Sequence, residues 1–305
     1  MKETQTAPRI SVLIVSYNHA GALRRCLQAL ELSTGRDTIE IVVVDNGSQD
    51  ESPALDSEFP NITLLRLPRN FGFTKALNIA MRTAKAELFL FLDANVEVTP
   101  ELAVSLADCL EKAPDAAAVC PLLVSPAQSA APAQFYRLPG PASVSKAACT
   151  GRFAPAPTLD TGEVPVTVEF PSLHALMVRA YFLKGLRYID ERYAQSWADA
   201  EIAAQIRRAG KKIYLAPGVR AVWHDDSEFF QSLPNSAQAL LAADWALGAA
   251  VFAGKYFGSF AGLKTRLAAI FHCLGQALTF REGSAFTRLG CLIGGQKIDG
   301  TQTSL

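Results

Sequence analysis

Three aspartates stand at positions where a carboxylate could do chemistry. Asp45 and Asp93 each end a short apolar run that is typical of a buried strand, and Asp199 stands near the start of a helical pattern. A carboxylate at a strand end can accept hydrogen bonds from a base or a ribose hydroxyl, or bind a metal ion, but it can equally cap the next helix. Asp199 could act as a general base that takes a proton from an attacking hydroxyl, or it could only stabilise its helix.

Further polar residues follow the same strand ends. The clusters are Tyr17-Asn18, Asp45-Asn46-Gly47-Ser48, Asn70-Phe71-Gly72-Phe73 and Asp93-Ala94-Asn95. Neither of the common phosphate-binding glycine motifs, GxGxxG and GxxxxGK[ST], occurs in the chain. The pyrophosphate of a bound nucleotide would therefore need a divalent cation held by Asp93, Asn95 and His224, or the basic side chains of Arg69 and Lys75. His224 could equally be a histidine with structural contacts only.

The elements that must position these residues alternate between strand and helix patterns. Strand-like runs at 10–16, 39–45, 62–67 and 87–92 are followed by helical patterns, one of which starts at a capping box of Ser48 and Glu51. This alternation predicts an α/β fold with a doubly wound, mostly parallel sheet and helices on both faces. Ligands of such sheets bind at the carboxyl ends of the strands, so we expect the polar clusters to share one rim.

The rest of the chain is less regular. Residues 121–165 hold eight of the 17 prolines and predict a long irregular connection or a pair of short strands. Strand patterns return at 166–170, 173–178, 212–215 and 219–223, with a helix at 199–208 among them, and helices are expected at 235–256, 260–281 and 284–296. We therefore divide the chain into a ligand-binding domain, 1–226, and a C-terminal helical extension, 227–305.

The composition excludes some classes of protein. Lys plus Arg is 29 and Asp plus Glu is 29, a balance without the general positive charge of a nucleic-acid binder. Six scattered cysteines without a CxxC pair, and an N-terminus without a signal-peptide pattern, favour a reducing, cytoplasmic location. The most apolar stretch, 239–254, is interrupted by Asp244, so we expect no transmembrane helix.

Six segments, in this order, resemble the family 2 glycosyltransferases with the GT-A fold, in particular their bacterial rhamnosyltransferase-like branch. They lie within residues 9–226 and read SVLIVSYNHAGALRRCLQAL, IEIVVVDNGSQDES, LPRNFGFTKALNIAM, LFLFLDANVEVTP, FPSLHALMVR with IDERY, and WADAEIAAQIRRAGKKIYLAPGVRAVWH. The resemblance implies inverting transfer of a sugar from a nucleoside diphosphate to a glycan or lipid-linked acceptor hydroxyl. A UDP- or dTDP-sugar is implied as donor, with dTDP-rhamnose as one candidate. This activity would serve synthesis of a cell-envelope polysaccharide.

The resemblance also implies roles for individual positions. The residues assigned to the donor nucleotide are Ser16, Tyr17, Asn18, Asp45, Asn46, Asn70, Gly72, Phe73, Lys75, Asn78 and Asp93. Asp93, Asn95 and His224 match the DxD motif and a histidine that hold Mg²⁺ or Mn²⁺ on the diphosphate. Asp199 falls where the family has its catalytic base, and Trp197 and His174 are assigned to the acceptor.

The sequence departs from the family pattern near the proposed chemistry. Asn95 replaces the second acid of the DxD motif, which puts the metal requirement in doubt. Ala198 replaces a Glu that often precedes the base, Glu201 replaces an Asp two residues after it, and Leu173 with His174 occupies the region of a usual Gly. These departures keep an alternative open, a non-catalytic GT-A-like domain that binds nucleotide sugar or glycan.

The C-terminal residues 255–305 contain six basic and two acidic side chains, a net charge of +4. Basic helices with aromatic and leucine positions can lie on an anionic membrane surface, which would place the protein at the inner face of the membrane. The same helices could instead cover the sheet or form a homodimer.

Overall fold

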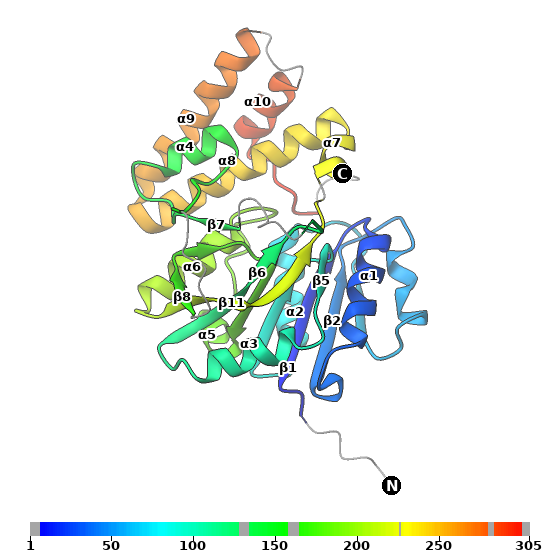
Figure 1. Cartoon of the computed structure of the whole chain (residues 1–305). Coiled ribbons are helices and arrows are strands. Elements are labelled where there is room, and N and C mark those ends of the chain that lie inside the picture. The colour runs from blue at the N-terminus through cyan, green and yellow to red at the C-terminus, as the bar shows by residue number, and fades with distance from the viewer. Residues whose placement is uncertain (1–6, 128–133, 158–164, 226, 280–283, 301–305) are drawn as a thin grey trace.

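The computed structural model describes residues 7–127, 134–157, 165–225, 227–279 and 284–300, and within them a mixed sheet of nine strands forms the centre (Figure 1). Its strand order is β3-β2-β1-β4-β10-β6-β11-β5, and β8 pairs with β11. The strands are β1 Ile10–Ser16, β2 Ile39–Asp45, β3 Thr63–Arg66, β4 Leu88–Leu92, β5 Val96–Val98, β6 Ala116–Val124, β8 Val166–Val168, β10 Ala175–Arg179 and β11 Lys212–Trp223. A separate pair consists of β7 Phe135–Tyr136 and β9 Phe170–Pro171.

The N-terminal half of the sheet is parallel. Strands β1, β2, β3 and β4 run in the same direction, and Ser16 at the end of β1 is the register partner of Asp45 at the end of β2. Strand β10 is antiparallel to β4 and β6, while β11 is parallel to β6. The carboxyl ends of β1, β2 and β4 therefore meet at one rim, which confirms the expected α/β architecture.

Helices cover both faces of the sheet because side chains alternate between the faces along each strand. On β1, Val12 and Ile14 point into a core shared with α1 Ala20–Glu31 and α3 Leu102–Glu111. Leu13 points the other way, into a core built with α2 Phe73–Thr83, α5 Ala180–Gly185 and α6 Ala198–Arg208.

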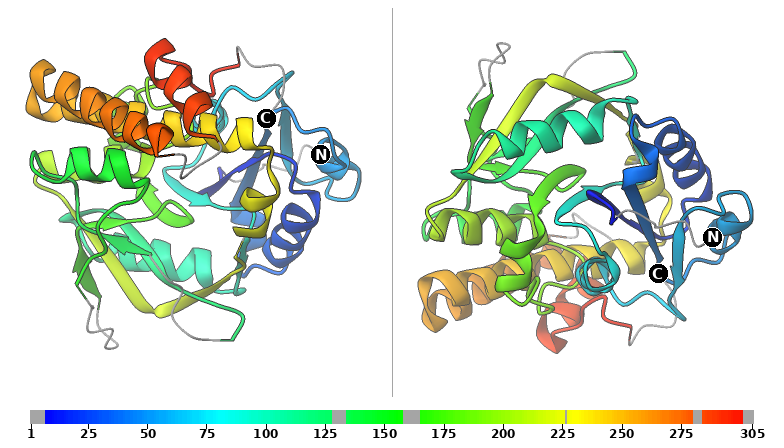
Figure 2. Two further views of the ribbon diagram at one scale, coloured as in Figure 1. Left: turned by 90° about the horizontal axis from the view of Figure 1, so that it is seen from above. Right: turned by 90° about the horizontal axis from the view of Figure 1, so that it is seen from below.

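A layer of further helices lies against this second core (Figure 2). It consists of α4 Val144–Thr150, α8 Asn235–Phe257, α9 Ser259–Leu278 and α10 Ala285–Gly294. The short α7 Ser227–Ser232 precedes this layer, and its Phe229 ring lies against His19, with centroids 4.2 Å apart. Helix α8 lies against α4, α9 and α10. A Cβ on Gly262 of α9 would meet the Ala250 carbonyl oxygen of α8 at 2.9 Å, so glycine allows the two helices their close approach. Because α8 belongs to the same hydrophobic cluster as the sheet, the division at residue 226 stays a prediction.

Helix α8 is the one described helix that is long and apolar enough to cross a membrane by length and composition. Of its most apolar window, 61% is buried inside the fold, as the core helix of a folded domain would also be. Asp244 lies in this helix with its side chain buried, and its carboxylate accepts backbone hydrogen bonds from Gln195 and Ser196.

The predicted capping box at Ser48 was wrong. The Ser48 hydroxyl accepts a hydrogen bond from the Asn18 backbone N–H (2.9 Å), and the Ser48 backbone N–H donates to Asp45 Oδ2 (3.1 Å). These contacts hold the loop at the rim, and the next element is a short 3₁₀ helix, η2 Ser52–Ser57. Another 3₁₀ turn, η1 Arg36–Thr38, precedes β2.

The proline-rich segment is more regular than its composition predicts. Strand β6 continues through Pro121 to Val124, opposite a register shift in β11 between Ala216 and Arg220 that accommodates a residue without an N–H. Helix α4 and strand β7 follow, and residues 128–133 and 158–164 of the segment lie outside the described residues. The two strands predicted at 212–215 and 219–223 form one continuous strand, β11. The short strand β5 was not predicted from the sequence.

Candidate active site

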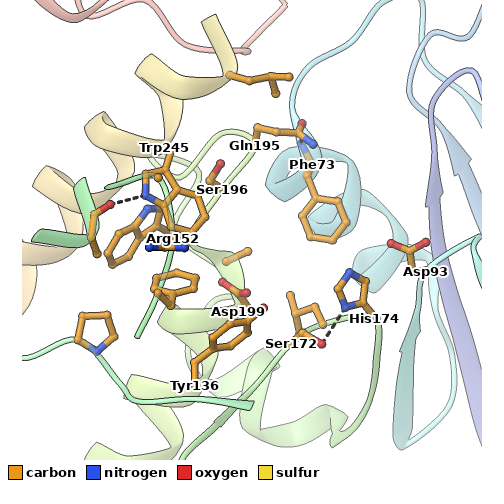
Figure 3. A pocket seen from close by; sticks show the side chains of 18 of the residues that line it. Phe73, Asp93, Tyr136, Arg152, Ser172, His174, Gln195, Ser196, Asp199 and Trp245 are labelled. Atoms are coloured by element: carbon orange, nitrogen blue, oxygen red, sulfur yellow. Dashed lines mark hydrogen bonds between the residues drawn. The ribbon is translucent and has the colours of Figure 1, made fainter. Parts of the chain in front are cut away.

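A cavity of about 1250 Å³ opens between the strand ends and the helical layer. One wall comes from the sheet and α2, with Val15, Phe73 and Asp93. The opposite wall comes from α4, the residues after it and α8, with Arg152 and Trp245 (Figure 3). The start of α6 lies between these walls and contributes Asp199. The cavity is larger than most small-molecule sites, so it has room for two substrates.

Asp199 lies in the first turn of α6, partly exposed to the cavity. Its Oδ1 accepts a hydrogen bond from the Ala200 backbone N–H at 2.8 Å. Burial raises the pKa of Asp199 to about 6, and this N–H and the nearby His174 act in the opposite direction. Asp199 in turn contributes, after burial, to raising the pKa of Tyr136 to about 12. A carboxylate with a pKa near neutrality is suited to general base catalysis.

Trp197 forms part of the wall beneath Asp199. It is 1% exposed, and its ring lies against Phe153, Trp245 and Phe252, with centroids 4.8 to 5.6 Å away. Its backbone is left-handed (φ 76°) immediately before α6 begins. A Cβ on Gly248 would approach the Trp197 ring at 2.7 Å, so glycine is needed opposite it. The assignment of Trp197 to the acceptor stays a prediction, and its contacts fix where α6 starts.

His174 lies at the sheet side of the cavity, and its assignment to the acceptor stays a prediction. Its Nδ1 is 2.8 Å from the Ser172 hydroxyl, and its carbonyl accepts a hydrogen bond from the Asp93 backbone N–H (2.8 Å). The centroid of its ring lies 5.3 Å from that of the Trp223 ring. The fold therefore brings His174, Asp93 and Asp199 to one cavity from three elements far apart in the sequence (Figure 3).

The three proposed metal ligands meet at this rim but are engaged with protein groups. Asp93 Oδ1 accepts hydrogen bonds from the backbone N–H (2.8 Å) and side-chain amide (3.1 Å) of Asn95. The His224 backbone N–H donates to the Asn95 carbonyl (3.0 Å), while His224 Nε2 is 3.0 Å from Glu97 Oε2. No group of three or more His, Cys, Asp or Glu side chains suited to a metal occurs among the described residues.

These residues fit a cation whose remaining ligands come from the phosphates of the substrate. Mg²⁺ commonly binds through one or two carboxylates together with substrate phosphates, rather than in an all-protein cage. Asp93 supplies such a carboxylate, and Asn95 holds it in place by two hydrogen bonds. Asn95 and His224 as direct ligands stay predictions.

The residues assigned to the donor nucleotide form a second group beside the cavity. Asn46 donates to Asn70 Oδ1 (2.9 Å) and accepts from the Phe71 N–H (3.0 Å), so it fixes the loop before α2. Burial raises the pKa of Asp45, while its hydrogen bonds with Ser48 lower it by a smaller amount. Its Oδ1 and the Ser16 hydroxyl are buried without a partner in the described chain. Buried polar atoms usually have partners, so a ligand or water is expected here.

Among the predicted site residues, those lining the cavity are Phe73, Asp93, His174, Trp197 and Asp199. Those outside its lining are Ser16, Tyr17, Asn18, Asp45, Asn46, Asn70, Gly72, Lys75, Asn78, Asn95 and His224. Asn78 exchanges hydrogen bonds with the backbone of Ile189 (2.8 and 3.1 Å), which is a structural role inside the fold. Lys75 Nζ lies 4.5 Å from the centre of the Phe71 ring.

The sequence reading missed the opposite wall. Tyr136, Arg137, Lys146 and Arg152 come from the segment treated as a connection, and Trp245 comes from α8. Trp245 Nε1 donates to the Ala147 carbonyl at 2.8 Å and thereby ties α8 to α4. No motif signals this wall, although a run with several basic and aromatic residues among prolines could have drawn attention to it.

Comparisons with known proteins agree with this architecture. Residues 11–140 match the model of glycosyl transferase family 2. The chain is 26% identical over 236 residues to the N-acetylglucosaminyl-diphospho-decaprenol L-rhamnosyltransferase of Mycobacterium tuberculosis, a match covering 70% of this chain and 76% of that protein. It is 31% identical over 97 residues to the putative glycosyltransferase EpsH of Bacillus subtilis, covering 31% of this chain and 28% of that relative's length.

Two solved structures share the fold. GalNAc-T7 with UDP, GalNAc and Mn²⁺ has a TM-score of 0.57 at 19% identity, over 72% of this chain and 44% of that one. The mannosyltransferase PcManGT from Pyrobaculum calidifontis, in complex with GDP-Man and Mn²⁺, has a TM-score of 0.52 at 19% identity, over 95% of this chain and 80% of that one. Both likenesses support the predicted GT-A fold.

Proposed function

We propose that this chain, which matches the model of glycosyl transferase family 2 over residues 11–140, moves a sugar from a nucleoside diphosphate to a lipid-linked or glycan acceptor, with inversion and with Asp199 as general base. A UDP- or dTDP-sugar is the proposed donor. The mycobacterial relative, whose name specifies rhamnose transfer to a lipid diphosphate, supports dTDP-rhamnose and a lipid-linked acceptor. Envelope polysaccharide synthesis in the cytoplasm, at the inner face of the membrane, is the proposed setting.

The observation that carries the proposal is the place of Asp199. Its carboxylate is exposed to the same cavity as Asp93, and its pKa is raised to about 6 by burial. At neutral pH this group is ionised, yet it is a better proton acceptor than an ordinary aspartate. An acceptor hydroxyl beside it would become a stronger nucleophile as its proton is lost.

The proposed reaction is a single displacement. The acceptor oxygen forms a bond to the anomeric carbon on the face opposite the diphosphate, while the bond from that carbon to the phosphate oxygen breaks. Asp199 receives the hydroxyl proton, which contributes ~10²–10⁴-fold to the rate. We expect the cavity, which has Phe73 on one wall and Trp245 on the other, to hold both substrates in line.

A divalent cation is part of the proposal through Asp93. When bound, such an ion would neutralise negative charge on the leaving diphosphate. The Asn95 contacts would keep the Asp93 carboxylate oriented toward it. The Mn²⁺ named with the two structural neighbours supports this proposal.

Replacing Asp199 with Asn tests the assignment, because asparagine keeps the shape but cannot accept the proton. Turnover of a panel of UDP- and dTDP-sugars with a lipid-linked acceptor should fall by ~10²-fold or more. Thermal stabilisation by the matching nucleoside diphosphate should remain. Asp108→Asn, an exposed change on α3, is the matched control. Turnover by the Asp199→Asn variant at the wild-type rate would overturn the role. Nucleotide binding without wild-type turnover on any acceptor would favour the non-catalytic alternative.

The C-terminal helices supply a proposed membrane contact. Seven large apolar side chains are exposed on the neighbouring helices α9 and α10, and this set is here called the α9–α10 face. They are Phe260, Leu263, Leu267, Phe271 and Leu278 of α9 and Phe286 and Ile293 of α10. The sequence has no acidic residue between Asp244 and Glu282. We propose that this face binds a lipid surface. The alternative is that it forms a homodimer, and an experiment must distinguish the two.

The C-terminal region has less positive charge available at its surface than its net charge of +4 indicates, because some of its basic side chains are engaged with protein groups. Lys255 pairs with Glu201 and Asp190 inside the fold. Arg266 donates to the carbonyls of Leu292 and Ile293 at the end of α10. Lys264 is an exposed base on α9. The proposed contact therefore depends mainly on apolar area, helped by the absence of acids.

A further inference from the structure

Three basic side chains line one wall of the cavity. Arg137 follows β7, Lys146 is on α4, and Arg152 follows α4. All three are exposed, and within the described ranges none has a carboxylate within 4.0 Å. The other full charges in the lining are the carboxylates of Asp93 and Asp199. The cavity is therefore divided by charge, with cations on the wall of the helical layer.

The fold holds these cations in one small unit. The Arg137 backbone N–H donates to the Ala154 carbonyl at 2.9 Å, so the strand before α4 lies beside the segment after it. Gly151, with φ 68°, ends α4 and turns the chain toward Arg152. The contact from Trp245 to the Ala147 carbonyl fixes α4 against α8. The three side chains thus lie on a wall built by α4 and its flanking segments.

The position of this wall separates it from the proposed donor site. In Figure 3, Asp199 lies between Arg152 on one side and Asp93 on the other. If the donor diphosphate lies at Asp93 and the attacking hydroxyl at Asp199, the basic wall lies on the acceptor side. Cations there would offset the free-energy cost of taking negative charge on the acceptor out of water.

The same wall is also apolar. Leu241, Ala242 and Trp245 of α8 line it, together with Tyr136 of β7. A carbohydrate acceptor alone would not use cations next to an aliphatic surface. An acceptor whose sugar is attached through phosphate groups to a hydrocarbon chain would use both.

We propose that Arg137, Lys146 and Arg152 form an anion subsite that binds the phosphate groups of a lipid-linked acceptor. This inference rests on the proposed function, because it names the acceptor class of the same cavity. The phosphates would contact the basic wall, the hydrocarbon would lie along α8, and the sugar hydroxyl would reach Asp199.

Geranyl diphosphate is a suitable soluble probe of this subsite. We would titrate it calorimetrically into the wild type in the presence of saturating UDP, so that the donor side is occupied. Arg137→Ala, Lys146→Ala and Arg152→Ala should each weaken binding by ~10-fold, as expected for loss of one charge-assisted contact, and the triple variant should weaken it further. Lys112→Ala removes an exposed cation at the end of α3, away from the cavity lining, and should leave the affinity unchanged.

Two further titrations identify the ligand chemistry. Geraniol lacks the phosphates, and inorganic pyrophosphate lacks the hydrocarbon, so both should bind more weakly than geranyl diphosphate. Affinity should also fall as salt is added, because the three cations are exposed and their attraction is screened.

Wild-type affinity in the triple variant, or no binding of geranyl diphosphate by the wild type, would overturn the subsite. Equal affinity for inorganic pyrophosphate would overturn the lipid-linked class. Failure of the proposed function looks different: sugar transfer would be independent of Asp199, while binding of geranyl diphosphate would still depend on the basic wall.

Discussion

Lys255 Nζ donates a hydrogen bond of 2.6 Å to Glu201 Oε1, and this contact joins helix α8 to helix α6. The Glu201 side chain is 4% exposed, and it also accepts hydrogen bonds from the Tyr256 hydroxyl and the Gln205 amide, both at 3.0 Å. Glu201 lies two residues after Asp199 in the same helix. The buried pair therefore holds the helix that carries the proposed base against the C-terminal layer.

Replacing Lys255 with Met should destabilise the protein by about 3 kcal/mol, because it leaves the Glu201 carboxylate buried without its counter-charge. In a Glu201→Gln background the same substitution should cost much less, since no buried charge remains unpaired. Urea unfolding of the four proteins gives this double-mutant cycle. Additive effects of the two substitutions would show that the pair has no energetic coupling.

The parallel half of the fold could be predicted because its strands are continuous apolar runs, such as IEIVVVD, buried on both faces. Strand β5 and helix α4 could not, because three residues and seven residues give too little periodicity beside a proline-rich composition. Ser48 failed as a cap because its hydroxyl and N–H bind Asn18 and Asp45, partners that become neighbours only in the folded sheet.

The acids of the site could be anticipated more readily than its basic wall. Asp93 ends a buried strand, and Asp199 begins a helix, so both positions follow from local patterns. Arg137, Lys146 and Arg152 come together through the pairing of Arg137 with Ala154 and the docking of α4 on α8. These are tertiary contacts that no local spacing encodes.

The pH dependence of turnover should report Asp199. Its pKa is about 6 in the protein, and the base acts only when deprotonated. Sugar transfer at subsaturating substrate should therefore fall below about pH 6, by about tenfold for each further pH unit. Initial rates between about pH 5 and pH 8 test this. A flat profile across that interval would contradict a base with this pKa, provided circular dichroism shows that the protein remains folded.

The same pKa predicts that Asp199 lowers stability at neutral pH. Its pKa is higher in the folded protein, about 6, than in an unfolded chain, where it is about 3.9. Between these values the folded state binds more protons, so stability falls as pH rises from about 4 to 6 and stays lower above. Asp199→Asn should thus be up to about 3 kcal/mol more stable than the wild type at pH 7. The difference should shrink toward pH 4, as measured by urea unfolding at both values; a constant difference would contradict the linkage.

Gly72 should be sensitive to the smallest side chain. It has φ 84°, and a Cβ there would lie 2.3 Å from the Ile298 carbonyl oxygen and 2.9 Å from that of Ala194. Gly72→Ala must therefore displace the segment around Ile298 and strain its own backbone, at a cost of about 1–3 kcal/mol. Thermal unfolding should show this loss. Gly140→Ala, where nothing lies within 4 Å of the added Cβ, is the control, and equal behaviour of the two variants would rule out the steric explanation.

Removing apolar side chains from the α9–α10 face should abolish the proposed membrane contact. Leu263, Leu267 and Phe271 are 55%, 43% and 66% exposed and follow one another at helical spacing, so together they present a stripe along α9. We expect the wild type to sediment with vesicles that contain phosphatidylglycerol, and somewhat more weakly with pure phosphatidylcholine, because the exposed Lys264 of α9 is attracted to anionic headgroups.

The triple substitution of these three residues by Ser should leave the protein in the supernatant, with its unfolding temperature unchanged because the side chains are exposed. Leu32→Ser, which removes a side chain that is 74% exposed after α1, should sediment as the wild type does. Light scattering measures the oligomeric state and so tests the alternative, a homodimer. A wild-type dimer that the triple variant splits, without any vesicle binding, would assign the face to a homodimer and contradict the membrane contact.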